Sequence, residues 1–115
     1  MNRHMIFISG PMTGYKDFNF PMFDTWEKIL KSRGYDVVNP ANIDRKYGLE
    51  KVLNDKNTFD AMINEELEEL GKCDTIFLLN GWEKSKGTRR ELKKALELGH
   101  EIMLQYNFHK ESDDV

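Results

Sequence analysis

The residues best suited to chemistry lie in one stretch, residues 81–102, with the sequence GWEKSKGTRRELKKALELGHEI. A glycine-bounded loop, residues 81–87, leads here into an amphipathic helix that is expected to carry Glu91 in its first turn. The Ser85 hydroxyl, the Gly87 backbone and the first N–H groups of the helix could bind a phosphate. A glutamate beside such donors could attack an anomeric carbon and form a glycosyl-enzyme ester.

The same residues have purely structural interpretations. Thr88 and Glu91 fit the capping-box pattern, in which the glutamate side chain accepts from the N–H of the threonine that caps the helix. From this string alone, capping is the simpler interpretation. The cations at positions 84, 86, 89 and 90 could form a solvated basic face. Because a helix N-terminus disfavours cations by roughly 0.3–1 kcal/mol each, we expect an anion, either Glu91 or a bound phosphate, to compensate them.

The elements that must position these residues follow from apolar periodicity. Strands are expected at residues 5–9, 35–39, 75–79 and 101–104, and helices at residues 20–33, at residues 58–70 and from Thr88 onward. Asn19 is the expected cap of the first helix. The glutamates of the second helix, Glu66 among them, are expected to be mostly solvated. Residues 41–57 are polar and weakly periodic, which predicts a connecting surface loop or, alternatively, a lid.

This βαβαβαβ order predicts an α/β fold, a flavodoxin-like (Rossmann-like) three-layer sandwich with a parallel sheet of four to five strands. In strand order 2-1-3-4, strands one and three meet at the topological switch point, so the GPMTG loop (residues 10–14) and the 81–87 loop face one crevice. Ser9, Gly10, Thr13, Ser85 and Glu91 could then reach one small ligand. The GPMTG loop lacks the three-glycine dinucleotide fingerprint, which disfavours a Rossmann dehydrogenase.

Length and composition exclude several classes of protein. At 115 residues the chain forms one domain, assigned to residues 1–108, and the polar residues 109–115 are expected to be a disordered tail. A net charge of −3 gives no basic field for a polynucleotide. No membrane span or signal peptide is recognisable, so a cytoplasmic protein is expected. The single Cys73 is expected to be buried and inert, and the scattered histidines predict no metal site.

Four segments in the same order, SGPMTG, VVNP, CDTIFLLNGW and SKGTRRELKKALELG, resemble the nucleoside 2-deoxyribosyltransferase-like superfamily. More narrowly, they resemble its short members, many of them phage or prophage proteins of unassigned function. The resemblance covers about residues 5–104. It implies a flavodoxin-like fold, a homodimer or larger homo-oligomer, no cofactor, and cleavage of the N-glycosidic bond of a nucleoside or nucleotide.

The resemblance also implies roles for single residues. The pattern S-x-G-x-x-x-E falls on Ser85, Gly87 and Glu91 and is similar to that of nucleotide N-hydrolases, in which the serine and glycine hold a 5′-phosphate and the glutamate is the nucleophile. An acidic residue eight positions before the strand-three aspartate helps to hold the sugar in some members, which corresponds to Glu66 before Asp74. Glu91 and Glu66 are thus the expected catalytic residues. The expected substrate-binding residues are Ser9, Gly10, Pro11, Met12, Thr13, Asn19, Gly81, Trp82, Ser85, Gly87 and Thr88.

Glu66 stands where the larger transferases have aspartate, which weakens its assignment to sugar binding. Two further departures favour hydrolysis over base transfer. Phe7 stands where the first strand of those enzymes has a tyrosine that hydrogen-bonds the nucleophile. The tail also offers no obvious equivalent of the C-terminal segment that enters a neighbouring subunit's active site in those enzymes.

The expected reaction is a retaining cleavage of a nucleoside or (deoxy)nucleoside 5′-monophosphate, in which Glu91 attacks C1′ and water, or less expectedly a second base, resolves the ester. Basic neighbours and the helix N-terminus are expected to keep the pKa of Glu91 low, and Glu66 to share sugar binding or proton transfer. Two alternatives stay open: a nucleotide-binding module without catalysis, and cleavage of a nicotinamide dinucleotide. A protein that only binds a nucleotide should largely retain its affinity in Glu91→Gln, because glutamine can still serve a capping box.

Overall fold

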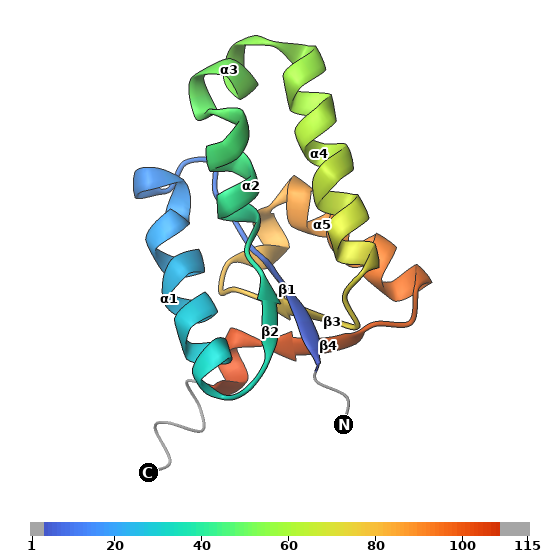
Figure 1. The fold of residues 1–115 in the computed structure, drawn as a ribbon. Coiled ribbons are helices and arrows are strands. Elements are labelled where there is room, and N and C mark those ends of the chain that lie inside the picture. Colours follow the sequence, from blue (N-terminus) through green and yellow to red (C-terminus); the bar gives the residue numbers. More distant parts are fainter. Residues whose placement is uncertain (1–3, 109–115) are drawn as a thin grey trace.

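The computed structural model describes residues 4–108, and its four strands form one parallel sheet. Strands β1 (Met5–Ser9), β2 (Asp36–Val38), β3 (Thr75–Leu78) and β4 (Glu101–Leu104) lie in the order β2-β1-β3-β4, which confirms the predicted topology (Figure 1). Since β1 and β3 are neighbours, the loops that follow them leave the same edge of the sheet. The tail predicted at residues 109–115 lies outside the described residues.

The helices with defined bounds in the described chain are five α-helices and two short 3-10 helices, and residues 105–108 are also helical. The defined bounds are η1 (Lys16–Asn19), α1 (Phe20–Ser32), α2 (Pro40–Tyr47), α3 (Leu49–Asn54), α4 (Lys56–Gly71), η2 (Trp82–Lys84) and α5 (Lys86–Glu97). Figure 1 shows α2, α3 and the upper part of α4 extending together away from the sheet. Within residues 4–108, no helix has both the length and the apolar character needed to cross a membrane.

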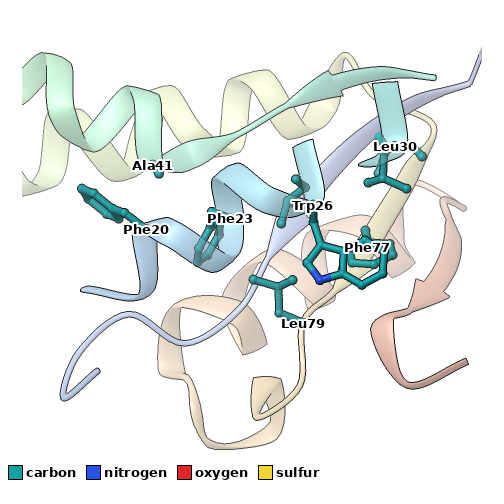
Figure 2. Close-up of a cluster of buried hydrophobic side chains, with 9 residues drawn as sticks. Phe20, Phe23, Trp26, Leu30, Ala41, Phe77 and Leu79 are labelled. Carbon is teal, nitrogen blue, oxygen red and sulfur yellow. The ribbon is translucent and has the colours of Figure 1, made fainter. Parts of the chain in front are cut away.

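The central strands are buried on both faces, as their continuous apolar runs predict. Ile6 and Ile8 of β1 pack on the α1 side, in a cluster with Phe23, Trp26 and Phe77 (Figure 2). Phe7, which points to the opposite face, packs with residues of α4 and α5. Helix α1 therefore covers one face and helices α4 and α5 cover the other, which gives the predicted three-layer sandwich.

The prediction that residues 41–57 form a loop is wrong. Asn39 caps α2 by accepting from the Ala41 N–H at 2.9 Å, and Pro40 occupies the first helical position, where its missing N–H costs little. Ile43 of α2, Val52 of α3 and Met62 of α4 form a third apolar cluster. These apolar residues are too few to make a clear sequence pattern, but they pack both short helices against α4.

Three predicted helix starts also need correction. Asn19 does not cap α1; its backbone is left-handed and its side-chain amide donates to the Pro11 carbonyl at 2.9 Å. Helix α4 begins at Lys56 rather than at residue 58, because Asp55 caps it. Helix α5 begins at Lys86 rather than at Thr88, which places Glu91 in its second turn.

Candidate functional site

The two predicted ligand-facing loops lie against each other. A Cβ on Gly10 would come within 2.7 Å of the Leu79 side chain, so only glycine fits between β1 and the end of β3. A Cβ on Gly81 would lie 2.7 Å from the Tyr15 hydroxyl, and the φ of Gly81 is +88°. Residues that follow β1 therefore touch residues that follow β3, as the predicted crevice requires.

Glu91 is held at the end of β1 by a short hydrogen bond. The Ser9 hydroxyl lies 2.5 Å from Glu91 Oε1 and is also hydrogen-bonded to Thr88 Oγ1 at 3.1 Å. All three side chains are buried, with Glu91 only 7% exposed. Ser9 comes from the last position of β1, and Thr88 and Glu91 stand one turn apart on α5. The contact fixes the orientation of the Glu91 carboxyl group.

The capping-box interpretation of Thr88 and Glu91 is wrong. Ser85 is the cap of α5, because its hydroxyl oxygen accepts from the Thr88 N–H at 3.1 Å. Thr88 is therefore the third residue of the helix. The Glu91 side chain bonds Ser9 instead of reaching back to the Thr88 N–H. Capping does not explain a glutamate at this position.

A second carboxyl group, Glu66, is buried near Glu91, together with an acid that sequence reasoning missed. Glu66 on α4 is 5% exposed, so of its two interpretations the solvated one is wrong, and Asp44 on α2 is 4% exposed. The two carboxyl groups lie within hydrogen-bonding reach of each other, and the charges of Glu91 and Asp44 both act on Glu66. Asp44 could have been found from the Asn39-Pro40 helix start, since position 44 then shares a helix face with Ala41.

Burial controls the protonation of these three acids. It raises the pKa of Glu91 to about 7, although the Ser9 hydrogen bond and the Arg90 charge act in the opposite direction. Burial raises the pKa of Asp44 to about 6. Burial, with the charges of Glu91 and Asp44, raises the pKa of Glu66 to about 10. The prediction that cations keep the pKa of Glu91 low is therefore wrong, because desolvation outweighs them.

The cations at the start of α5 have different roles. Arg90 favours the charged forms of both Glu66 and Glu91. Arg89 instead donates from Nε and Nη2 to the Glu83 carbonyl, at 3.0 and 2.7 Å, and ties α5 to η2. Lys84 and Lys86 are exposed. The Glu91 carboxylate is thus one of the anions expected to balance the cations at the start of α5, and it interacts with the charge of Arg90.

The remaining predicted binding residues, in and near the two loops, differ in burial and in the groups that they contact. Pro11 is buried, Thr13 is exposed, and Asn19 is engaged with the Pro11 carbonyl. Met12 packs against the core on the α1 side, and Trp82 against the core on the α4 and α5 side. Ser85 and Gly87 are half-buried at the start of α5. The structure brings Ser9, Thr88 and Glu91 into direct contact and leaves Thr13 and Asn19 outside that contact.

Two surface hollows lie on α4, and no predicted site residue lines either of them. One, of about 390 Å³, is bounded by Phe59, Asp60, Ile63, Asn64 and Arg90. The other, of about 560 Å³, is bounded by Tyr47, Ala61, Asn64, Glu65, Glu68, Glu69 and Lys72. Arg90 lines the first hollow, and its charge also favours the ionised forms of the buried Glu66 and Glu91.

Cys73 is buried, as predicted, and burial raises the pKa of its thiol to about 12. A thiol with so high a pKa is a poor nucleophile at neutral pH. Among residues 4–108, no three or more His, Cys, Asp or Glu side chains are placed to hold a metal ion.

Comparison with known families gives one match. Residues 4–104 match a family model described as "Domain of unknown function (DUF4406)", and the chain belongs to this family. No curated protein matches the chain. The family description assigns no activity, so a function must be argued from the residues.

Proposed function

We propose that this member of the DUF4406 family cleaves the N-glycosidic bond of a nucleoside or (deoxy)nucleoside 5′-monophosphate, with Glu91 as nucleophile and water as acceptor. The observation that carries the proposal is the buried hydrogen bond between Ser9, which directly precedes the GPMTG loop, and Glu91, which follows the 81–87 loop on α5. A carboxyl group that is desolvated and oriented in this way is costly to bury, and such arrangements are typical of functional sites.

Ser9 supports the proposal because it donates a hydrogen bond to Glu91, which the Phe7 side chain cannot do. In the transferases that the sequence resembles, a first-strand tyrosine hydrogen-bonds the nucleophile. Phe7 is fully buried in the core on the α4 and α5 side and has no polar atom in its side chain. Ser9, two residues further along β1 and on the same face, donates to Glu91 instead. Ser9 is therefore a hydrogen-bond donor to Glu91, although Phe7 is not.

The proposed chemistry has two steps. The ionised Glu91 attacks C1′ while the glycosidic bond breaks through an oxocarbenium-like transition state, and the departing base takes the proton of Glu66. In the second step water attacks C1′, the ester bond to Glu91 breaks, and the water proton passes to Glu66. Burial favours the protonated form of Glu66, and so supports its role as acid.

The start of α5 suits a 5′-phosphate. Ser85 Oγ accepts from the Thr88 N–H, which leaves the Ser85 hydroxyl proton for a ligand. The N–H groups of Lys86 and Gly87 precede the first helical hydrogen bond, which runs from the Arg89 N–H to the Ser85 carbonyl. These donors, together with the helix dipole, support the proposal that a 5′-phosphate binds here.

The test is release of free base from a panel of ribo- and deoxyribonucleosides and their 5′-monophosphates, followed by chromatography. Wild-type protein should release base, and Glu91→Gln should be slower by about a thousandfold or more, because the amide is a poor nucleophile. Glu97→Gln, on the exposed surface of the same helix, is the matched control and should keep full activity.

The same experiment can also contradict the proposed role of Glu91. Glutamine can keep the contact with Ser9, so Glu91→Gln should remain folded. If neither protein releases base, and both bind a nucleotide equally well, Glu91 is not a nucleophile and the chain is a binding module.

A further inference from the structure

We propose that Asp44 is a positioning residue for this reaction, because it shares one proton with Glu66 and thereby holds the Glu66 carboxyl group protonated. The use of that proton in catalysis rests on the proposed function. The sharing itself does not, and it can be measured without a substrate.

The carboxyl groups of Asp44 on α2 and Glu66 on α4 lie within hydrogen-bonding reach of each other, and both residues are more than nine-tenths buried. Asp44 Oδ1 and Glu66 Oε2 are fully buried, and no N–H or O–H group of any other described residue donates to them. Two ionised carboxylates have only acceptors and cannot form a hydrogen bond. One proton shared between the two carboxyl groups would give them a hydrogen bond that no other described residue supplies to these oxygens.

The surrounding charges decide which residue keeps the proton. From α5, the Glu91 charge raises the pKa of Glu66, and Arg90 opposes it. The interaction between the two acids raises the pKa of Glu66 and lowers that of Asp44. Glu66 is therefore the donor and Asp44 the ionised acceptor. Two like acids held in unlike environments in this way are a common basis for acid and base roles.

The cations next to Asp44 are engaged elsewhere. Arg45 forms an ion pair with Asp24 and lies over the Phe20 ring. Lys46 pairs with Glu65 at 2.9 Å. With both neighbouring cations directed outward, Glu66 is the hydrogen-bond donor proposed for Asp44.

Helix α2 is fixed on two sides, so Asp44 is held in place. At its start, the Asn39 side-chain amide donates to Asp24 at 2.9 Å and to Glu27 at 3.1 Å, both on α1. At its end, the Tyr47 hydroxyl donates to Glu65 of α4 at 2.8 Å. A carboxylate on a helix anchored in this way can orient the Glu66 proton without touching the substrate.

The primary experiment is a pH titration of the full chain by NMR, with ¹³C-labelled carboxyl groups in Asp and Glu. The Glu66 signal is identified by its loss in Glu66→Gln. We expect this carboxyl to stay protonated through pH 8 in the wild type and to ionise at lower pH in Asp44→Asn, because the neighbouring negative charge is gone. Asp60→Asn removes an exposed acid of α4 and should leave the titration of Glu66 unchanged.

A kinetic measurement tests whether the shared proton is used in catalysis. With an active substrate, Asp44→Asn should lower kcat at pH 8 by about tenfold with little change in KM, and should move the alkaline limb of the pH profile to lower pH. A purely structural role for Asp44 would leave the pH profile unchanged, which would overturn the positioning role.

The two proposals fail in different ways. If Glu66 ionises in the ordinary acid range in the wild type, or if Asp44→Asn does not move its titration, proton sharing is wrong whatever the activity. If no substrate releases base while Glu66 titrates as expected, the proton-sharing pair stands, and the glycosidase proposal and the catalytic use of the proton both fall.

Discussion

At the scale of single residues, the candidate site depends on one desolvated carboxyl group and its hydrogen bond. Glu91 is buried among groups that oppose each other: desolvation favours its neutral form, and the Ser9 hydroxyl and Arg90 favour its charged form. The result is a carboxyl group that titrates close to neutral pH. If Glu91 is the proposed nucleophile, its reactive ionised form is populated near pH 7 and increases above it.

Ser9→Ala tests the hydrogen bond directly. Bonds to charged groups contribute about 1.5–3 kcal/mol, so loss of this one should lower kcat for base release by roughly ten- to a hundredfold. Ser32→Ala removes an exposed serine that bonds the Ile29 carbonyl, and should have no effect on base release. Steady-state kinetics would measure both variants. Unchanged kcat in Ser9→Ala would remove Ser9 from the site.

The pH dependence of kcat/KM should be bell-shaped. The rate should rise through about pH 7 as Glu91 ionises, and should fall near pH 10 as Glu66 loses its proton. Initial rates of base release between pH 5 and pH 10.5 would show both limbs. An acid limb near pH 4.5, the ordinary value for glutamate, would mean that Glu91 is not desolvated when it reacts.

At the scale of secondary-structure elements, α2 is the unexpected part of the site. It places Asp44 against α4, and it is held by Asn39 at its start. The Asn39 side chain accepts from the Ala41 N–H and donates to two carboxylates of α1, so one buried amide joins β2, α1 and α2.

Asn39→Ala should therefore destabilise the protein by about 1–2 kcal/mol, the usual range for loss of a helix cap. Urea denaturation followed by circular dichroism would measure the change. Asn57→Ala is the control, since this asparagine is exposed in the first turn of α4. Equal stabilities of the two variants would show that the Asn39 contacts contribute nothing.

At the scale of the whole molecule, the buried acids should make stability fall as pH rises. The pKa values of Asp44, Glu66 and Glu91 are raised on folding, so the folded chain holds protons that the unfolded chain releases above about pH 4.5. Raising the pH therefore favours the unfolded state, by up to about 1.4 kcal/mol per pH unit for each such group. Contacts that lower the pKa values of Asp24 and Asp55 act oppositely, and are lost only as pH falls below about 4.

The wild type should be more stable at pH 5 than at pH 9, as urea midpoints would show. Glu66→Gln should make this decline shallower, because glutamine carries no proton to lose. Glu68→Gln, an exposed position on the same helix, should not. Stability that is constant or increases from pH 5 to pH 9 in the wild type would contradict the burial of these acids as protonated groups.

Self-association stays a prediction from the family resemblance. We expect a homodimer or larger homo-oligomer in size-exclusion chromatography with light scattering. A monomer at all protein concentrations would contradict the expectation without affecting the buried site.

The order of the strands was determined by the sequence alone, and the same pattern led to the prediction of where the candidate site lies. Apolar runs such as MIFIS and TIFLL specify buried strands locally, and the alternation of strands with helices leaves few topologies for a parallel sheet. The rule that ligands bind at the carboxyl ends of the neighbouring strands β1 and β3, at the topological switch point, then points to the GPMTG and 81–87 loops. Glu91 could be selected because it follows such a loop by a few residues.

Only the tertiary structure decided how that glutamate is held and in what charge state. Ser9 and Glu91 are 82 positions apart, and no local pattern links them. Helices α2 and α3 form because Ile43, Val52 and Met62 bury one another, which weak local periodicity does not reveal. Desolvation is a property of the packed molecule, so the raised pKa values of Asp44, Glu66 and Glu91 arise only when α2, α4 and α5 exclude water from the acids between them.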